Sequence, residues 1–409
     1  MKSNQRKLIA AAVAMLSSTG ASALELNAGD YKFTVNGNIN VHYIYSSCEN
    51  NAVAVGGGLA CTETGSAGNN SSISNGLLPA ALTFGIITQQ AGLDIEGHFG
   101  FYPGVSSNDG GSPNLQQGAP LGTNVALATT ALDVRQVYLT FGNKDIGTFS
   151  LGRNFGLFGF DAIINDITIP GVGAAGAAAV GAPANTTLGS IGLGYIYVDT
   201  LAQINYTTPD FAGFKATVGI YDPLNPVGAA ASQHSAPGFH GKLQYTTNFS
   251  GAKLYLSATG LTQKQNDVGG PGNNYTSSAF DFGGKLTIAD FELAGWYYVG
   301  DGVGTTALFL NSDDGAGNKR ESDGFLAQAT YKLGATKLGV NYGVSSLDLA
   351  GGEVNPTLVK DNKKITGGIY HSLTKNLTLV GEVTAVEAKN HSGGKNEAIN
   401  FNIGTFLSF

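Results

Sequence analysis

Apolar and polar residues alternate strictly along the first long segment that follows the amino-terminal region of the chain. From Tyr31 to Tyr45 every second residue is apolar, aromatic or glycine, and the residues between them are polar with the exception of Ile44. A period of two residues is that of a β-strand whose two faces meet different surroundings. The alternation lasts for fifteen residues, whereas strands in soluble proteins have about five or six. This pattern predicts a tilted strand with lipid on its apolar side and water on its polar side.

The carboxyl end repeats this pattern, because apolar residues occupy alternate positions from Ile399 to Phe409 apart from Thr405. Similar alternation recurs at residues 93–101, 280–288 and 291–299, where the charged residues keep to one face. An open sheet edge is unstable in hydrocarbon, where no water satisfies its backbone groups, so the first and last strands must pair. The sequence therefore predicts a closed barrel.

The connections between the alternating segments differ in length in a regular way. Short turns are predicted at residues 90–92, 143–147, 209–213, 248–251, 289–290, 332–335 and 372–376. Long stretches rich in Gly, Asn, Ser and Asp alternate with them, at residues 46–76, 103–127, 154–190, 222–237, 263–276, 300–322, 345–361 and 388–396. Short periplasmic turns and long external loops are typical of outer-membrane barrels. The prediction is an all-β fold, a transmembrane antiparallel β-barrel of about sixteen strands in one domain over residues 24–409.

The first 23 residues have the three zones of a secretory signal peptide. Lys2, Arg6 and Lys7 precede an apolar run over residues 8–16, and the segment ends on Ala21-Ser22-Ala23. That run is far shorter than the ~20 residues of a membrane-spanning helix, so we expect residues 1–23 to be removed on export. The whole chain carries a net charge of −7, and removing the three basic residues of the signal leaves the mature chain at −10.

The composition excludes several other classes of function. An acidic chain without a basic stripe is not expected to bind nucleic acid. The six His and two Cys residues show no metal-binding spacing, so neither a metal nor another cofactor is predicted. Cys48 and Cys61 lie in a Gly-, Asn- and Ser-rich stretch of an exported chain, and we expect them to form one disulfide that pins a loop.

The connection that follows Arg153 is unusually apolar for an external loop. It begins with several Phe and Leu residues, continues through four Ile residues to Pro170, and ends in a Gly/Ala tract up to Gly181. Such side chains are badly placed in open water, so this third loop is predicted to fold into the barrel. A barrel of sixteen strands leaves an aqueous channel, which an inward loop would narrow.

Two blocks of sequence around this loop resemble the general trimeric porins of Gram-negative outer membranes. They are residues 135–142 (RQVYLTFG) and 145–154 (DIGTFSLGRN), and residues 206–214, residues 370–375 and the terminal Phe409 are also similar to that family. The resemblance implies a homotrimer that lets small hydrophilic solutes diffuse passively. It also implies outer-membrane lipid and lipopolysaccharide as surroundings, and a constriction where acids of the third loop face basic residues of the wall.

The resemblance places Arg135 as a basic wall residue and Arg153 in the Gly-Arg pair of the family. The family carries an acid cluster close after a Pro-Glu-Phe-Gly-Gly stretch, whereas residues 170–174 read PGVGA here and contain no acid. Asp161 and Asp166 are therefore the candidates for the acids of the constriction. Capping within the loop is an almost equally good interpretation of both.

The alternation also predicts which charged side chains face the lumen. Opposite charges across a narrow pore would create a field that orients polar solutes. For every charged side chain predicted to face the lumen except Arg135, the plainer interpretation is a solvated charge without a specific role. The predicted lumen residues are Lys32, His42, Asp94, Glu96 and His98, together with Lys215, Lys242, Lys253 and Lys285.

Three alternatives to a general porin differ in what they require of the sequence. A barrel enzyme would need Ser, His and an acid side by side, and no serine neighbour is evident for the inward His42 or His98, so no enzyme is predicted. A purely structural barrel is disfavoured by the polar lumen rows. A solute-specific channel stays open, with the tract at residues 171–182 making the constriction apolar or flexible; Trp296 and Tyr298 alone do not make a sugar track.

Overall fold

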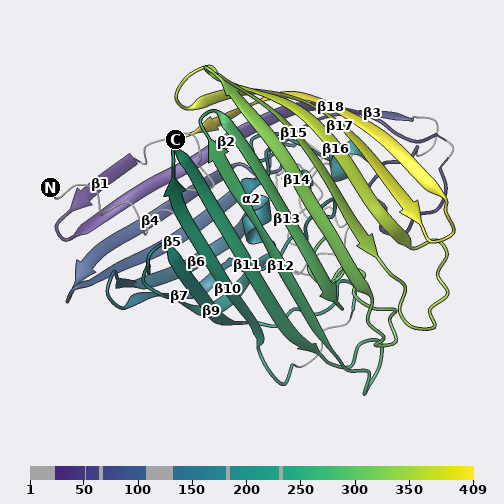
Figure 1. The fold of residues 1–409 in the computed structure, drawn as a ribbon, viewed down its shortest axis with the longest axis horizontal. Helices are drawn as coiled ribbons and strands as arrows, with labels where there is room; N and C mark the ends of the chain where they lie inside the picture. The colour runs from purple at the N-terminus through teal and green to yellow at the C-terminus, as the bar shows by residue number, and fades with distance from the viewer. Residues whose placement is uncertain (1–23, 51, 64–67, 107–131, 181–184, 230–233) are drawn as a thin grey trace.

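A computed structural model describes residues 24–50, 52–63, 68–106, 132–180, 185–229 and 234–409. One antiparallel sheet closes on itself as a barrel (Figure 1). The predicted signal peptide lies outside the described residues. The strands are β1 (Leu24–Ala28), β2 (Tyr31–Ser47), β3 (Asn69–Ser74), β4 (Ala81–Gln90), β5 (Leu93–Pro103), β6 (Leu132–Asn143), β7 (Gly147–Phe155), β8 (Thr200–Thr207), β9 (Phe214–Tyr221), β10 (Gly238–Phe249), β11 (Ala252–Gln265), β12 (Tyr275–Ile288), β13 (Phe291–Asp301), β14 (Glu321–Leu333), β15 (Thr336–Leu347), β16 (Val359–Ser372), β17 (Leu377–Asn390) and β18 (Lys395–Ser408).

These strands occupy sixteen positions around the barrel, which confirms the predicted number. Two pairs of strands share a position. Along one edge of β2, β3 pairs with residues 42–47 and β4 with residues 31–38. Along the other edge, β18 and β1 divide β2 in the same way. Each remaining strand pairs with its neighbours in the sequence.

The two ends of the described chain close the barrel together. β18 pairs with β2 from Ser47 down to Asn38, and β1 continues from Val35 to Tyr31. Between them, Phe409 and Gly37 exchange two backbone hydrogen bonds of 2.8 and 3.0 Å. The edge of β2 is thereby paired along its length, as a membrane barrel requires.

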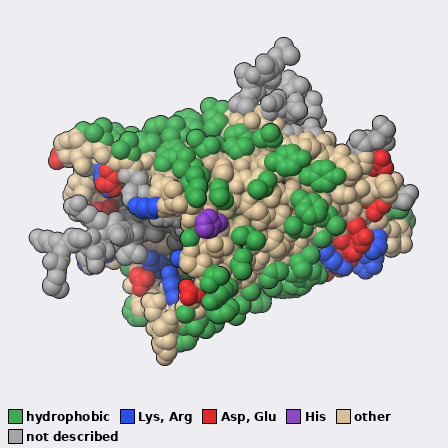
Figure 2. Space-filling view, turned by 90° about the horizontal axis from the view of Figure 1, so that it is seen from above, with side chains coloured by type: hydrophobic (Ala, Val, Ile, Leu, Met, Phe, Trp, Pro, Cys, Tyr) green, Lys and Arg blue, Asp and Glu red, His purple; other side chains and the backbone are tan. Residues whose placement is uncertain are grey.

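The predicted faces of the strands are confirmed by burial. On β2, Ile39 and Tyr43 are half exposed on the outer surface, whereas Asn40 and His42 are buried inside. Figure 2 shows hydrophobic side chains over the middle of the outer surface, with charged side chains gathered toward its two ends. This distribution matches an apolar band in lipid between two polar rims. No helix in the described ranges is long and apolar enough to cross a membrane.

Among the described residues, turns and loops are distributed as predicted with two differences, of which the first is that β3 lies inside the loop expected over residues 46–76. Two-residue turns such as Ala91–Gly92, with φ of 49° and 78°, have the left-handed geometry that suits tight hairpins. The loop expected over residues 388–396 is shorter than predicted, because β17 and β18 pair as far as Lys389 and Lys395.

Two covalent or ionic links organise the external loops. Cys48 and Cys61 form the predicted disulfide, with Cα atoms 5.0 Å apart. Arg320 donates two hydrogen bonds, of 2.8 and 2.6 Å, to the carboxylate of Glu353 in the next long loop. These bonds hold the pKa of Glu353 below its usual value. Such a bidentate pair fixes geometry as well as charge.

The closure at Gly37 generates a testable prediction. A Cβ atom at this position would lie against the carbonyl oxygen of Ala81 and 2.7 Å from Cζ of Phe409. We expect Gly37→Ala to destabilise the barrel by about 1–3 kcal/mol, the usual cost of overpacking. Unfolding in urea, followed by gel mobility of unheated samples, measures this.

Gly97→Ala on β5 is the matched control, because a Cβ atom there would meet nothing within 4 Å. Equal urea midpoints for the two variants would contradict the closure described here.

Candidate functional site

The connection between β7 and β8, residues 156–199, is hereafter the third loop, and its described residues, 156–180 and 185–199, run inside the barrel. It contains the short helix α2 (Phe160–Asn165) and a 3₁₀ turn, η3 (Gly176–Val180), and Figure 1 shows α2 enclosed by the strands. Phe158 is fully buried and lies edge-on to Tyr298 of β13, with ring centroids 6.3 Å apart. The predicted inward fold of this loop is confirmed.

Apolar contacts hold the third loop to the wall at several points. Ala162, Ile169 and Tyr195 cluster with Trp296 of β13 and Leu326 of β14. Trp296 thus supports the loop, as Tyr298 does, and neither belongs to an open aromatic track.

The Gly/Ala tract explains the one apolar residue on the polar face of β2. Ile44 is fully buried against Val172, Ala175, Ala178 and Ala179. The small side chains let the loop backbone approach the wall closely, and a Cβ atom on Gly173 would collide with the backbone of Gly189. The described part of the tract therefore packs on the wall.

Asp161 anchors α2 to the wall. Its carboxylate lies 3.2 Å from Nζ of Lys242 on β10 and accepts a 2.9 Å hydrogen bond from the hydroxyl of Tyr255 on β11. Close by, the backbone N–H of Gly159 donates to Asp281 of β12 at 2.7 Å. Asp161 and Lys242 are both buried, so each compensates the charge of the other.

Asp166 organises the turn that follows α2. It accepts hydrogen bonds from the backbone N–H and hydroxyl of Thr168 at 3.0 and 2.8 Å. The hydroxyl of Tyr195 and the side chain of Asn341 on β15 donate to it as well, at 2.8 and 3.0 Å. These contacts favour the capping interpretation for Asp166.

Glu382 of β17 is an anchor that the sequence analysis missed. It accepts hydrogen bonds from the backbone N–H groups of Val172 and Gly173 at 2.8 and 2.9 Å. Tyr370 and Asn402 complete its surroundings, with donors at 2.6 and 2.9 Å. The signal was available, because alternation on β17 places Glu382 on the inner face. The alternation does not show which segment of the third loop lies against Glu382.

A β-bulge in β6 turns Arg135 into the barrel. The register against β5 shifts between Gly100 and Tyr102, so Arg135 and Gln136 are both buried. The guanidinium lies 2.7 Å from Asp133, donates to Asn185 of the third loop at 3.3 Å, and lies 5.4 Å from the ring centre of Tyr102.

Arg153 lies at the end of β7, where its Nε donates to the hydroxyl of Thr200 at 3.3 Å. The positive charges of Arg135 and Arg153 both act on the carboxyl of Asp199, at the end of the third loop. The structure thus brings the two arginines together with Asp133 and Asp199, while Asp161 and Asp166 bind other parts of the wall. Asp199 was missed because it adjoins a strand and follows no acid motif.

Other predicted lumen residues lie on strands β2 and β5 of the barrel wall. Lys32 pairs with Glu25 of β1, and Asp94 accepts a hydrogen bond from Gln89 at 2.9 Å. His98 stacks on Tyr138 with ring centroids 4.8 Å apart, and His42 is fully buried. Glu96 is partly exposed. Within the described ranges, no three His, Cys, Asp or Glu residues are placed to hold a metal ion.

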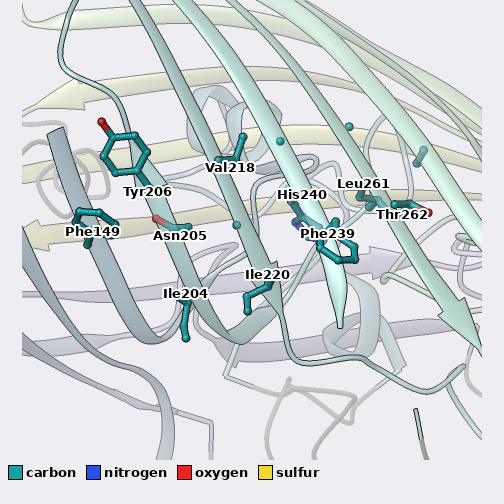
Figure 3. A pocket seen from close by; sticks show the side chains of 14 residues that line it. Phe149, Ile204, Asn205, Tyr206, Val218, Ile220, Phe239, His240, Leu261 and Thr262 are labelled. Carbon is teal, nitrogen blue, oxygen red and sulfur yellow. The ribbon is translucent and has the colours of Figure 1, made fainter. Parts of the chain in front are cut away.

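A groove on the outer wall differs from the lumen in its lining. Figure 3 shows Ile204, Val218, Ile220 and Phe239 around it. All four are outward-facing and exposed, so this groove belongs to the lipid-facing surface.

The barrel, its polar inner face and its inward loop define a class of protein, the channels of bacterial outer membranes. The family model of the Gram-negative porins matches residues 10–391, and the chain belongs to that family. It is an outer-membrane channel for the passive diffusion of solutes. No curated protein matches the sequence.

Solved structures of similar fold include three outer-membrane proteins. The channel DcaP of Acinetobacter baumannii has a TM-score of 0.68 and 13% identity, over 95% of this chain and 100% of that one. An anion-selective porin from Comamonas acidovorans has a TM-score of 0.59 and 12% identity, over 93% of this chain and 100% of that one. Salmonella typhi OmpF, in complex with daunomycin, has a TM-score of 0.58 and 14% identity, over 94% of this chain and 100% of that one. At these identities the likeness concerns the fold alone.

The anchor at Glu382 can be tested by Glu382→Gln. The amide would present its NH₂ group to a site made of donors, so the backbone N–H groups of Val172 and Gly173 would lose an acceptor. Losing such a bond costs about 1–3 kcal/mol, which corresponds to about tenfold or faster hydrogen exchange at these two amides. Exchange mass spectrometry of peptides that cover them measures the effect.

Glu387→Gln is the control on the same strand, because Glu387 pairs with Lys363 at 3.5 Å on the outer face. Equal exchange in the two variants would show that Glu382 does not hold the loop.

Proposed function

We propose that the protein is a homotrimeric general porin for small hydrophilic solutes, exported with a signal peptide that is cleaved after Ala23. The third loop narrows its path, and outer-membrane lipid and lipopolysaccharide surround it. The observation that carries this proposal is the third loop, which is anchored across the lumen by buried carboxylates. An outer-membrane protein of Vibrio cholerae with this fold, at a TM-score of 0.51 and 14% identity, is described in a trimer form, which supports the trimer. The family favours a channel without enzymatic activity.

We further propose that Arg135 and Arg153, with Asp133 and Asp199, set the charge along the narrow part of the path. Two positive and two negative groups lie close together there. Their charges nearly cancel, so removing one of them leaves a net local charge of the opposite sign. Asp161 and Asp166 contribute chiefly by holding the loop in place.

A solute-specific channel is the second candidate. The Gly/Ala tract supports it only in part, since its described residues pack against Ile44 and the wall. An apolar or flexible constriction formed by residues 171–182 stays a prediction.

Arg135→Ala is expected to shift the selectivity toward cations, because Asp133 and Asp199 would lose a compensating charge. A partly screened charge contributes about 0.5–1 kcal/mol, which corresponds to about a two- to fivefold change in the ratio of cation to anion permeability. The reversal potential in a KCl gradient across a planar bilayer measures this ratio.

Arg135→Lys is the control, because it keeps the charge and should stay close to the wild type. A reversal potential unchanged by Arg135→Ala would remove Arg135 from the constriction.

A further inference from the structure

Lysine side chains gather on one arc of the inner wall, close to the periplasmic turns. Each lies within three residues of the periplasmic end of its strand. The strand register turns them inward. Lys285 is the cross-strand partner of Tyr255, and Lys215 is that of Gln244. The side chains of Tyr255 and Gln244 are hydrogen-bonded to each other inside the barrel. The group, hereafter the lysine arc, consists of Lys215 on β9, Lys253 on β11, Lys285 on β12, Lys332 on β14 and Lys337 on β15.

The lysine arc is only weakly neutralised. Among its described neighbours on the inner wall at this level, Glu292 of β13 is the one acid, and its carboxylate lies 3.9 Å from Nζ of Lys285. Lys215 has a similarly loose pair, with Asp210 of the adjoining turn at 3.9 Å. The side chains of Lys285 and Glu292 are 32% and 37% exposed, so they are open to water and to solutes.

Two lysines of the arc face each other directly. Lys332 and Lys337 are cross-strand partners in the hairpin of β14 and β15. Like charges in that relation repel and destabilise a sheet. Nζ of Lys337 lies 5.3 Å from the ring centre of Tyr370, which steadies one of the two. An anion between the two ammonium groups would replace the repulsion by attraction.

The opposite arc carries the opposite charge. Asp94 and Glu96 face inward from β5 at the same level, and β5 is halfway around the sixteen-position barrel from β13. On the inner wall at this level, lysines thus predominate on one arc and carboxylates on the other, where Lys32 is paired with Glu25 of β1. A cleft lined by one sign of charge concentrates ions of the other sign. The segregation is notable in a chain whose net charge is −7.

We propose that the lysine arc is a binding site for small oxyanions, phosphate or carboxylates, at the periplasmic mouth of the channel. Lysine is a point charge on a flexible stem and binds phosphate without the fixed fork of arginine. Such a site binds weakly enough to release its ligand, as conduction requires. The site rests on the proposed diffusion function and gives it a preferred class of solute.

The test compares inorganic phosphate block of KCl current in planar bilayers for the wild type and for Lys285→Gln/Lys332→Gln/Lys337→Gln. The triple variant should raise the half-blocking phosphate concentration about tenfold, since each exposed charge contributes a modest share. The control is Lys144→Gln/Lys360→Gln/Lys389→Gln, which removes the same charge from a turn and from the external ends of β16 and β17. It should block like the wild type.

Equal half-blocking concentrations in the two triple variants, or a wild type that phosphate does not block, would overturn the site while leaving the channel intact. A folded wild type without any KCl current would instead overturn the diffusion function, and the site with it.

Discussion

The structure depends on one constraint, which is that every backbone N–H and C=O group at membrane depth must find a partner within the protein. β-Strands can meet it only as a closed ring. Here the ring closes where β18 and β1 share the edge of β2, with Phe409 and Gly37 bonded between them. The long alternating strands, the tight turns and the pairing of the chain ends all follow from this requirement.

Closure leaves a wide interior, and the third loop divides that interior. The third loop crosses it and is held to the wall through carboxylates in three places, by Asp161 with Lys242, by Asp166 with Asn341, and by Glu382 with two backbone N–H groups. Buried charges are tolerated only with partners, so each anchor fixes its loop segment firmly. Toward the periplasm, the inner wall carries partly exposed charges, mostly lysines on one arc and carboxylates on the opposite arc, and we propose that these act on solutes.

The sequence was sufficient to predict the barrel because alternation has a direct physical cause in the two solvents that meet each strand. Strand number and turn positions were predicted for that reason, whereas the disulfide followed from the two cysteines of an exported chain and the inward course of the third loop from its apolar side chains. Ile44, an exception to the alternation, marked the place where the Gly/Ala tract packs. The short connection after β17 was misjudged, because Gly, Ser and Asn can end a strand or continue it.

The partners of the charged residues could not be predicted in the same way. Alternation tells which face a residue occupies, but not which loop segment reaches it. For Asp161 the sequence therefore left open an acid of the constriction or a cap within the loop, and its contact with the wall, like the roles of Glu382 and Asp199, was not predicted. The bulge that turns Arg135 inward is likewise a local irregularity with no periodic signal.

This barrel is an open, water-filled path despite the loop inside it. Recording the wild-type protein in a planar bilayer with symmetrical KCl tests this most directly. We expect discrete current steps, in groups of three for a trimer, with a conductance that rises in proportion to the salt concentration. Folded protein that inserts into the bilayer and carries no current would contradict it.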